Sequence, residues 1–199
     1  MLDSEVPGVY FGTGSETNIY LDSELKDDKV VFTKKRGSIQ RLCESAKICN
    51  SLDNADFFIR NVNIQDEKIN FLNKDVNVLF ACLLYMTKHI QMGLVNIDKI
   101  DDMMNMAAII AGGMDKLKAN PLFSFITCII KSPLEMVDDT TDKLIKIAEY
   151  GMPVVLSSSP QGGSTAPIQE EGMVSMINAE ILAGVVLSQS VNPGTPVLY

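Results

Sequence analysis

The segment from residue 152 to residue 199 places the strongest constraint on how this chain can fold. In order, it contains an apolar run, a glycine-rich loop, a stretch of helical length and a second apolar run: Met152–Ser157, Ser158–Ile168, Gln169–Val191 and Thr195–Tyr199. The helix is predicted to end at Asn192-Pro193-Gly194, because proline cannot continue a helix. Two buried strands joined by a loop and a helix form a right-handed βαβ unit.

The same alternation of strand and helix extends back to residue 57. Apolar, β-branched runs predict strands near residues 57, 88, 123, 152 and 195, with helical periodicity between them. We therefore predict an α/β fold with about five parallel strands and crossover helices. A (β/α)8 TIM barrel needs eight strands and usually about 250 residues. Five strands fit either part of such a barrel or a complete open sheet, and the pattern alone does not separate the two.

The residues before this alternation have a different pattern. Asn18–Leu21 and Val30–Thr33 are short β-branched runs, and the turn-forming stretch Asp22–Asp28 between them predicts a β-hairpin. A helix is predicted over Ser38–Leu52, with Ser38 as its N-cap. We predict a β-hairpin and helix over 1–54, leading into an incomplete barrel over 55–199. The barrel is expected to be truncated at its C-terminal end, because the sequence stops inside an apolar strand.

Composition narrows the functional classes. The chain is 46% hydrophobic and 21% charged, as in globular proteins that bury a core. We expect no membrane span, because the most apolar helix is interrupted by Asn178 and Glu180. The net charge is −8 and the only tight basic cluster is Lys34-Lys35-Arg36, so we expect no nucleic-acid partner. The N-terminus has no basic region of a signal peptide, which favours the cytoplasm.

Metal chemistry is not predicted. The four cysteines, at positions 43, 49, 82 and 128, include no C-x-x-C pair, and His89 is the single histidine. Two acidic groups, around Asp101 and Asp139, begin predicted helices, where they complement the helix dipole. We therefore predict no metal site.

Glu180 is the most unusual residue of the predicted helix, because its neighbours three and four positions away are all apolar. A buried carboxylate must be paired, hydrogen-bonded or neutralised. We favour a structural role, in which Glu180 accepts backbone hydrogen bonds and holds a neighbouring loop. The alternative is a ligand for a cationic substrate. Asn178 could bridge to the glycine-rich loop or be a helix-surface amide.

The loop Ser158–Ile168 is predicted to form one wall of a substrate cavity, with Gln161, Ser164 and Thr165 as polar contacts. A phosphate cradle is less favoured, because no lysine of a P-loop is present. The loop hydroxyls could instead satisfy their own backbone. A serine hydrolase using Ser164 is a rival, but the second glycine of a nucleophile elbow is missing. Its only possible base, His89, is predicted at the start of a strand, whereas barrel enzymes catalyse at the opposite end.

Three patterns in this chain resemble the trimethylamine methyltransferase family. They are S-x-P-x-G-G-S-T-A-P-I over Ser158–Ile168, N-A-E-I-L-A-G from Asn178, and N-P-G-x-P-V from Asn192. Ser132-Pro133-Leu134, which follows the strongest predicted strand, resembles a further S-P-L element. The resemblance implies a (β/α)8 barrel whose mouth includes Ser132, Asn178 and Glu180. One departure is Gln169-Glu170-Glu171-Gly172, where many members have T-L-A-G.

The resemblance also implies an activity in methylamine metabolism, including methanogenesis. Family members move a methyl group from trimethylamine, or from a quaternary amine such as glycine betaine, to the Co(I) corrinoid of a partner protein. The cobalt is the nucleophile, so no catalytic residue of this chain is predicted, and the corrinoid (cobalamin) belongs to the partner rather than to this chain. A homo-oligomer is expected for the full-length protein, and the 199-residue piece alone is expected to be inactive. The alternatives are a non-catalytic cation-binding relative and an unrelated α/β hydrolase.

Overall fold

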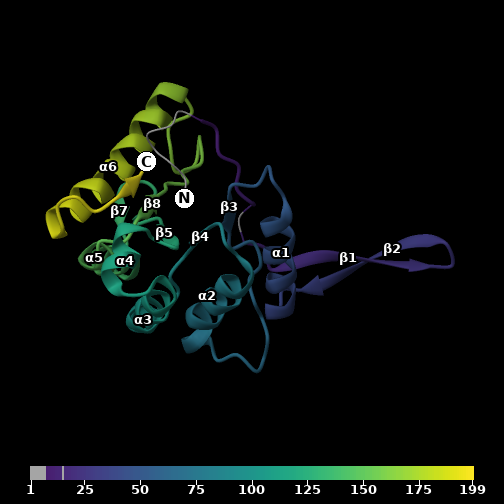
Figure 1. The fold of residues 1–199 in the computed structure, drawn as a ribbon. Coiled ribbons are helices and arrows are strands. Elements are labelled where there is room, and N and C mark those ends of the chain that lie inside the picture. The colour runs from purple at the N-terminus through teal and green to yellow at the C-terminus, as the bar shows by residue number, and fades with distance from the viewer. Residues whose placement is uncertain (1–7, 15) are drawn as a thin grey trace. The chain divides into compact units, whose positions relative to one another are not determined.

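The computed structural model describes residues 8–14 and 16–199, which form two compact units. The first contains the described residues up to Gln91 together with Asp98–Met114, and the second contains Met92–Ile97 and Asp115–Tyr199. Figure 1 labels most of the helices and strands of both. The predicted boundary at residue 54, between a leading segment and an incomplete barrel, stays a prediction.

The first unit combines a hairpin with parallel strands and helices. Its main elements are β1 (Ile19–Lys26), β2 (Lys29–Arg36), α1 (Ile39–Ser51), β3 (Phe57–Ile59), α2 (Lys74–Tyr85), β4 (His89–Met92) and α3 (Ile100–Ala111). Strands β3 and β4 pair in parallel, with Phe58 opposite Ile90. Helix α1 packs on α2, and α2 packs on α3. The predicted cap is confirmed, since the Ser38 hydroxyl accepts a hydrogen bond from Arg41 N.

The N-terminal hairpin is present but longer than predicted. Strands β1 and β2 pair antiparallel along their whole length, and only Asp27 and Asp28 form the turn. Both turn residues have positive φ angles, 48° and 59°, which a type I′ hairpin turn requires and aspartate tolerates. The prediction of a turn over Asp22–Asp28 was therefore wrong. The charged residues that resembled a loop lie within the strand, where Asp22 and Glu24 form ion pairs with Lys35 of β2.

The second unit contains the predicted βαβ segment. Its elements are α4 (Met114–Ala119), β5 (Phe123–Thr127), β6 (Ile130–Lys131), β7 (Glu135–Met136), α5 (Asp138–Tyr150), β8 (Val154–Leu156), α6 (Glu170–Val191) and β9 (Val197–Leu198). Strand β8 pairs in parallel with both β5 and β9. Helices α5 and α6 are the crossovers, and α5 ends at Gly151, whose φ of 68° forms its C-cap. The predicted α/β class is confirmed.

The parallel strands fit part of a (β/α)8 barrel. Five occur in chain order, with crossover helices between them, and they do not close into a barrel within residues 8–14 and 16–199. Two small elements were not predicted, β6 and β7, which pair antiparallel directly after β5. Each has only two residues, too few for a periodicity to be visible in the sequence.

Helix α6 packs on the sheet through a narrow stripe. Its buried residues are Glu180, Gly184 and Ser188, which recur every four positions and therefore share one face. A Cβ atom on Gly184 would lie 2.9 Å from Leu156 Cδ1, so the helix approaches β8 closely. Among the described residues, α6 is also the one helix whose length and composition would allow it to cross a membrane. A single helix of this kind is weak evidence of a membrane span, because buried core helices and signal sequences meet the same criterion.

A close backbone approach at Gly37 gives a test of the first unit. A Cβ atom there would lie 2.2 Å from the Asn63 carbonyl oxygen, and backbone cannot move aside cheaply. We expect Gly37→Ala to destabilise the protein by about 2 kcal/mol, measured as a lower urea midpoint. Gly14→Ala is the matched control, because nothing lies within 4 Å of its Cβ position. Equal midpoints for the two variants would contradict the packing described here.

Candidate functional site

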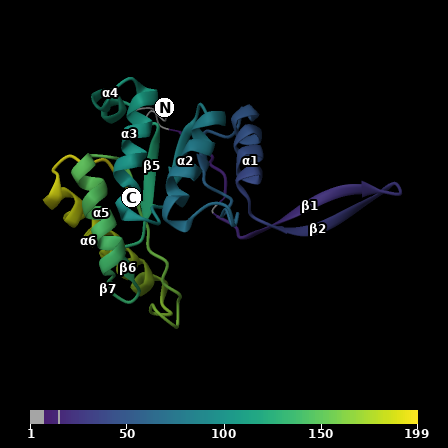
Figure 2. The ribbon, with the colours of Figure 1, turned by 90° about the horizontal axis from the view of Figure 1, so that it is seen from below.

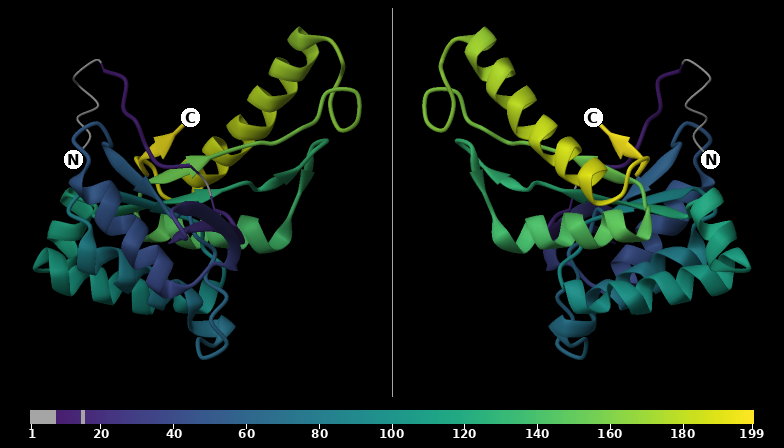
Figure 3. Two further views of the ribbon diagram at one scale, coloured as in Figure 1. Left: turned by 90° about the vertical axis from the view of Figure 1, so that its right-hand side faces the viewer. Right: turned by 90° about the vertical axis from the view of Figure 1, so that its left-hand side faces the viewer.

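Two loops of the second unit leave the sheet at the same edge. Strands β5 and β8 run parallel and end level with each other, with Thr127 opposite Leu156. Ser157 N donates a hydrogen bond of 3.1 Å to the Thr127 carbonyl, which continues the pairing by one residue. Figure 3 shows the β6–β7 segment and the loop before α6 on this side of the strands. Ligands of parallel α/β folds bind at this carboxyl edge.

Glu180 of α6 connects both loops. Its side chain is 2% exposed. Oε1 accepts a hydrogen bond of 3.0 Å from Leu134 N, and Oε2 accepts one of 2.8 Å from the Ser132 hydroxyl. Oε2 also accepts a hydrogen bond from the Ser158 hydroxyl. One carboxylate therefore holds the loop after β5, the loop after β8 and the helix that covers them.

The charge of this carboxylate is stabilised by its donors. Burial alone would raise the pKa of Glu180, but the hydrogen bonds from Leu134 N, Ser158 and Ser132 outweigh it and hold the pKa below its ordinary value. Glu180 is thus a buried anion whose hydrogen-bonding capacity is directed into two loops. This geometry is the structural role that the sequence analysis favoured.

The loop after β5 is shaped to present its backbone to Glu180. Residues Ser132, Pro133 and Leu134 connect β6 to β7; the Ser132–Pro133 peptide is cis, and Leu134 has a φ of 57°. The Leu134 side chain is exposed while its N–H donates to the buried carboxylate. Ser132, predicted at the barrel mouth, is therefore a direct partner of Glu180.

The glycine-rich loop satisfies much of its own backbone. The Gln161 carbonyl accepts hydrogen bonds from the backbone N–H groups of Ser164, Thr165 and Ala166, at 2.9–3.0 Å. The Thr165 hydroxyl in turn accepts one of 2.8 Å from Gln161 N. Of the three predicted contact residues, Gln161 and Ser164 are exposed. The Thr165 side chain instead forms a hydrogen bond within the loop. Sequence reasoning missed Ser158, although it is one of three consecutive serines directly after β8.

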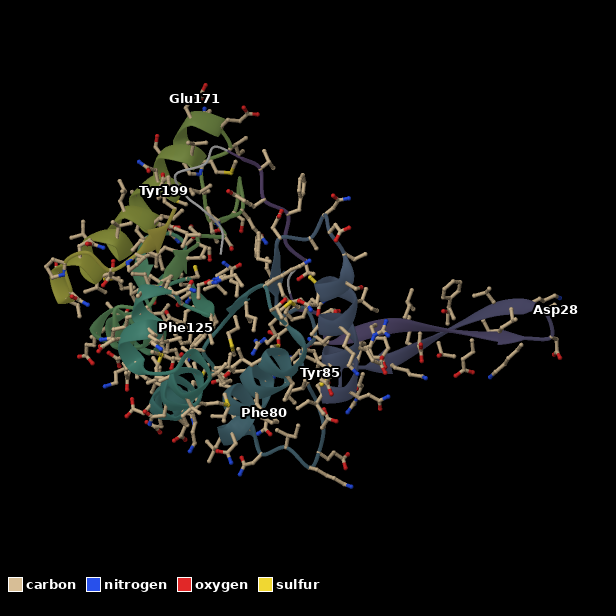
Figure 4. All side chains as sticks on the ribbon, in the orientation of Figure 1. Asp28, Phe80, Tyr85, Phe125, Glu171 and Tyr199 are labelled. Carbon is tan, nitrogen blue, oxygen red and sulfur yellow. The ribbon has the colours of Figure 1, made fainter. Side chains whose placement is uncertain are left out.

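Asn178 is a surface amide with a partner outside the loop. It lies on the exposed side of α6, and its Oδ1 accepts a hydrogen bond from the Tyr199 hydroxyl. Figure 4 labels Tyr199, which follows β9. The alternative in which Asn178 bridges to the glycine-rich loop is not observed among the described residues. Asn178 instead connects α6 to the strand that follows it.

The first unit has a charged cluster that sequence reasoning missed. Arg60 follows β3 directly and is 6% exposed. Its Nη2 lies 2.6 Å from Glu16 Oε2, and its Nη1 lies 3.9 Å from Asp75 Oδ1. Thr13 adds two hydrogen bonds to the backbone of Ile59. Together these contacts attach the segment before the hairpin to β3; an arginine directly after an apolar strand was the available signal.

The cysteines and His89 are the remaining residues that the sequence analysis considered for chemistry. They contain no cluster of three or more histidine, cysteine or acidic side chains able to hold a metal ion. Burial raises the pKa of the Cys128 thiol, which follows β5, and it raises the pKa of Cys82 to about 12. Strand β4 begins at His89, as predicted, so this histidine is at the amino end of its strand.

Comparison with known proteins decides the family. The model of the trimethylamine methyltransferase family matches residues 26–199, most of the chain. The chain belongs to the trimethylamine methyltransferase family. A trimethylamine methyltransferase of Desulfitobacterium hafniense is 33% identical over 156 residues, which are 77% of this chain and 30% of that protein. One of Methanosarcina mazei is 32% identical over 164 residues, 80% of this chain and 32% of that protein.

A second activity occurs among the similar family members. A glycine betaine methyltransferase of Desulfitobacterium hafniense is 41% identical over 103 residues, 51% of this chain and 21% of that protein. The chain therefore spans about a third or less of the length of these curated relatives of the trimethylamine methyltransferase family. The resemblance inferred from the sequence motifs is confirmed, and the two loops joined by Glu180 contain two of those motifs.

The hydrogen bonds of Glu180 predict a pH-dependent stability. At neutral pH, Glu180→Gln should destabilise the protein by about 2–3 kcal/mol, because charged hydrogen bonds are lost and a donor faces donors. The pKa is lowered in the folded state, so the stabilisation is complete above the ordinary value of 4.5 and is lost as the pH falls through the folded value. The difference in stability between the parent protein and the Glu180→Gln variant should therefore become smaller below pH 4.5. Urea midpoints measured over a range of pH values test this.

The matched control is Glu171→Gln. Glu171 is exposed in the first turn of α6 and is labelled in Figure 4. Its removal should cost less than about 1 kcal/mol, the size of a helix-dipole contribution. A Glu180→Gln variant that is as stable as Glu171→Gln at neutral pH would show that the carboxylate does not hold the loops.

Proposed function

We propose that the complete product of this gene is a methyltransferase that moves a methyl group from a small methylated amine to a corrinoid carried by a partner protein. The observation that carries this proposal is the family match over residues 26–199. The substrate class follows from the relatives, two of which are named for trimethylamine and one for glycine betaine. We also predict that the complete protein works with a cognate corrinoid protein, forms a homo-oligomer and is located in the cytoplasm.

This chemistry requires little of the protein beyond binding and orientation. The Co(I) corrinoid of the partner supplies the nucleophile, so the residues of this chain have to hold the amine in line for attack. Correct placement of the reacting groups can lower the activation barrier by several kcal/mol. A rigid wall at the carboxyl edge of the sheet suits that task, and the loops fixed by Glu180 offer one.

We assign Glu180 a positioning role in this function. Its two oxygens already accept hydrogen bonds from Ser132, Leu134 and Ser158, so its geometry acts on the loops. Its negative charge would still favour a cationic amine nearby, because a buried charge is poorly screened. Gln161 and Ser164, which are exposed on the second loop, are the candidates for direct contact with the amine or the partner.

The proposal is tested by methyl transfer with the complete protein. The complete protein and the reduced corrinoid protein are mixed with trimethylamine, glycine betaine or an unmethylated amine. The visible spectrum of the corrinoid reports its methylation. We expect transfer from one of the two methylated amines and none from the unmethylated control. Absence of transfer from every methylated amine, with tight binding of one by calorimetry, would instead establish a non-catalytic cation-binding protein.

Two variants separate the roles of the loop residues. If Glu180 acts through the loops, Ser132→Ala and Glu180→Gln should both reduce kcat, by about tenfold for a modest misplacement, with smaller changes in KM. If Glu180 contacts the cation directly, Glu180→Gln should raise KM while Ser132→Ala does not. Ester hydrolysis that disappears in Ser164→Ala, without any methyl transfer, would support the hydrolase alternative and overturn the proposal.

A further inference from the structure

The first unit contains a cavity that the proposed function does not use. Its volume is about 290 Å³, and all of its lining residues lie between β3 and the first residue of α2. Figures 1 and 2 show this stretch of chain passing the base of the β1–β2 hairpin on its way to α2. The cavity is therefore built by one connecting segment of the first unit.

Hydrogen bonds to neighbouring elements hold this segment in place. Gln65 N donates a hydrogen bond of 2.9 Å to the Gly37 carbonyl, and Gln65 Nε2 donates one of 2.6 Å to the Asn18 carbonyl. Asp66 Oδ2 accepts a hydrogen bond of 2.8 Å from Ile39 N, at the beginning of α1. The hairpin base and α1 therefore fix the position of two lining residues, Gln65 and Asp66.

Lys74 contributes a cation to the lining of the cavity. Its Nζ donates a hydrogen bond to Asn63 Oδ1, which leaves two of its three N–H groups for other acceptors. Burial lowers the pKa of Lys74, and the nearby carboxylates of Glu16 and Asp75 oppose this only in part. Both carboxylates form ion pairs with Arg60, and no ion pair among the described residues includes Lys74. A partly desolvated cation of this kind gains more from an anionic ligand than a fully hydrated one.

Asp66 and Gln65 contribute acceptors to the same cavity. Asp66 Oδ1 and Gln65 Oε1 have no hydrogen-bond partner among the described residues, because their contacts use Oδ2 and Nε2. Asp66 and Lys74 line one cavity without forming an ion pair with each other. The cavity therefore presents a cation and an anion, each with capacity for a further partner.

Apolar side chains complete the lining. Ile64 is buried and Ile69 is half-buried, while the Phe71 ring, from a single 3-10 turn directly before α2, is exposed. An apolar group of a ligand placed here would leave water together with the Phe71 ring, which is favourable. A volume of 290 Å³ corresponds to about ten water molecules, so the cavity suits a ligand of about ten non-hydrogen atoms.

We propose that this cavity binds a free amino acid with a small apolar side chain. The carboxylate of the amino acid accepts hydrogen bonds from Lys74. Its ammonium group donates hydrogen bonds to Asp66 and Gln65, and its side chain packs against Phe71 and Ile69. Each charged group of the ligand thus meets a charge of opposite sign in the cavity lining.

The charges and acceptors of the cavity favour this ligand class over two others. A phosphate group carries a charge of about −1.5 to −2 at neutral pH, and here it would face a single lysine and also the carboxylate of Asp66. A quaternary ammonium group has no N–H, so it would cover the acceptors of Asp66 and Gln65 without giving them a donor. Binding at this cavity is therefore independent of the methyl transfer proposed above.

Calorimetry on the complete protein tests the ligand class, with L-leucine as the probe. Three analogues each lack one feature: 4-methylpentanoate has no ammonium group, 3-methylbutylamine has no carboxylate, and N,N,N-trimethyl-L-leucine has no N–H. We expect L-leucine to bind, and each analogue to bind at least about tenfold more weakly, because a polar group of the cavity then lacks its partner. Absence of leucine binding, or equal affinity for any of the three analogues, would overturn the proposal.

Variants of the complete protein test the place of binding. Lys74→Gln and Asp66→Asn should each weaken leucine binding at least about tenfold, and Asp66→Asn keeps an acceptor for Ile39 N. Glu67→Gln and Lys68→Gln are the matched controls, because both residues are exposed in the same segment and do not line the cavity. Both controls should bind leucine as the parent protein does.

Methyl transfer measured on the same variants separates the two functions. Lys74→Gln should lose leucine binding and retain methyl transfer, because Lys74 lies in the first unit, outside the loops that Glu180 holds. Leucine affinity that is unchanged in either Lys74→Gln or Asp66→Asn would show that the amino acid binds elsewhere, and would overturn the proposal.

Discussion

The second unit depends on one buried carboxylate. Without Glu180, the N–H of Leu134 and the hydroxyls of Ser132 and Ser158 would lose a shared acceptor. A buried donor without an acceptor costs about 1–3 kcal/mol. The carboxylate in turn is tolerated inside an apolar helix face only because these donors stabilise its charge. The two loops and this face of α6 therefore stabilise one another.

Glu180 also fixes how α6 lies on the sheet. One turn after it, Gly184 allows the helix to approach Leu156 of β8, and Ser188 continues the same stripe. The Ser188 hydroxyl donates a hydrogen bond of 2.9 Å to the Val185 carbonyl. The side chain is therefore small, and its polar group has a partner. A narrow stripe of this kind leaves the apolar side chains beside it exposed, Val186 among them. The high proportion of apolar residues in α6 therefore suggests more burial than the helix has.

The sequence predicted features that depend on local chemistry. Ser38 as a cap, Gly151 as a stop and the βαβ rhythm all follow from a few neighbouring residues. It did not predict β6 and β7, because each has only two residues and the turn between them is held by the distant Glu180. The predicted hairpin was too short, because Asp22 resembles a loop residue in the sequence. Its ion pair with Lys35, on the neighbouring strand, becomes visible only in the structure. The buried Arg60–Glu16 pair likewise joins positions far apart in the chain.

The motifs that identify the family coincide with this assembly, which explains why they are informative. Ser132, Ser158 and Glu180 belong to three separate motifs, yet they meet at one carboxylate. Such residues hold two loops and a helix together and need not contact a substrate. The relatives that match this chain are named for two different methylated amines, trimethylamine and glycine betaine. Under the proposed function, exposed Gln161 and Ser164 are the side chains of this chain that these loops would present to a substrate.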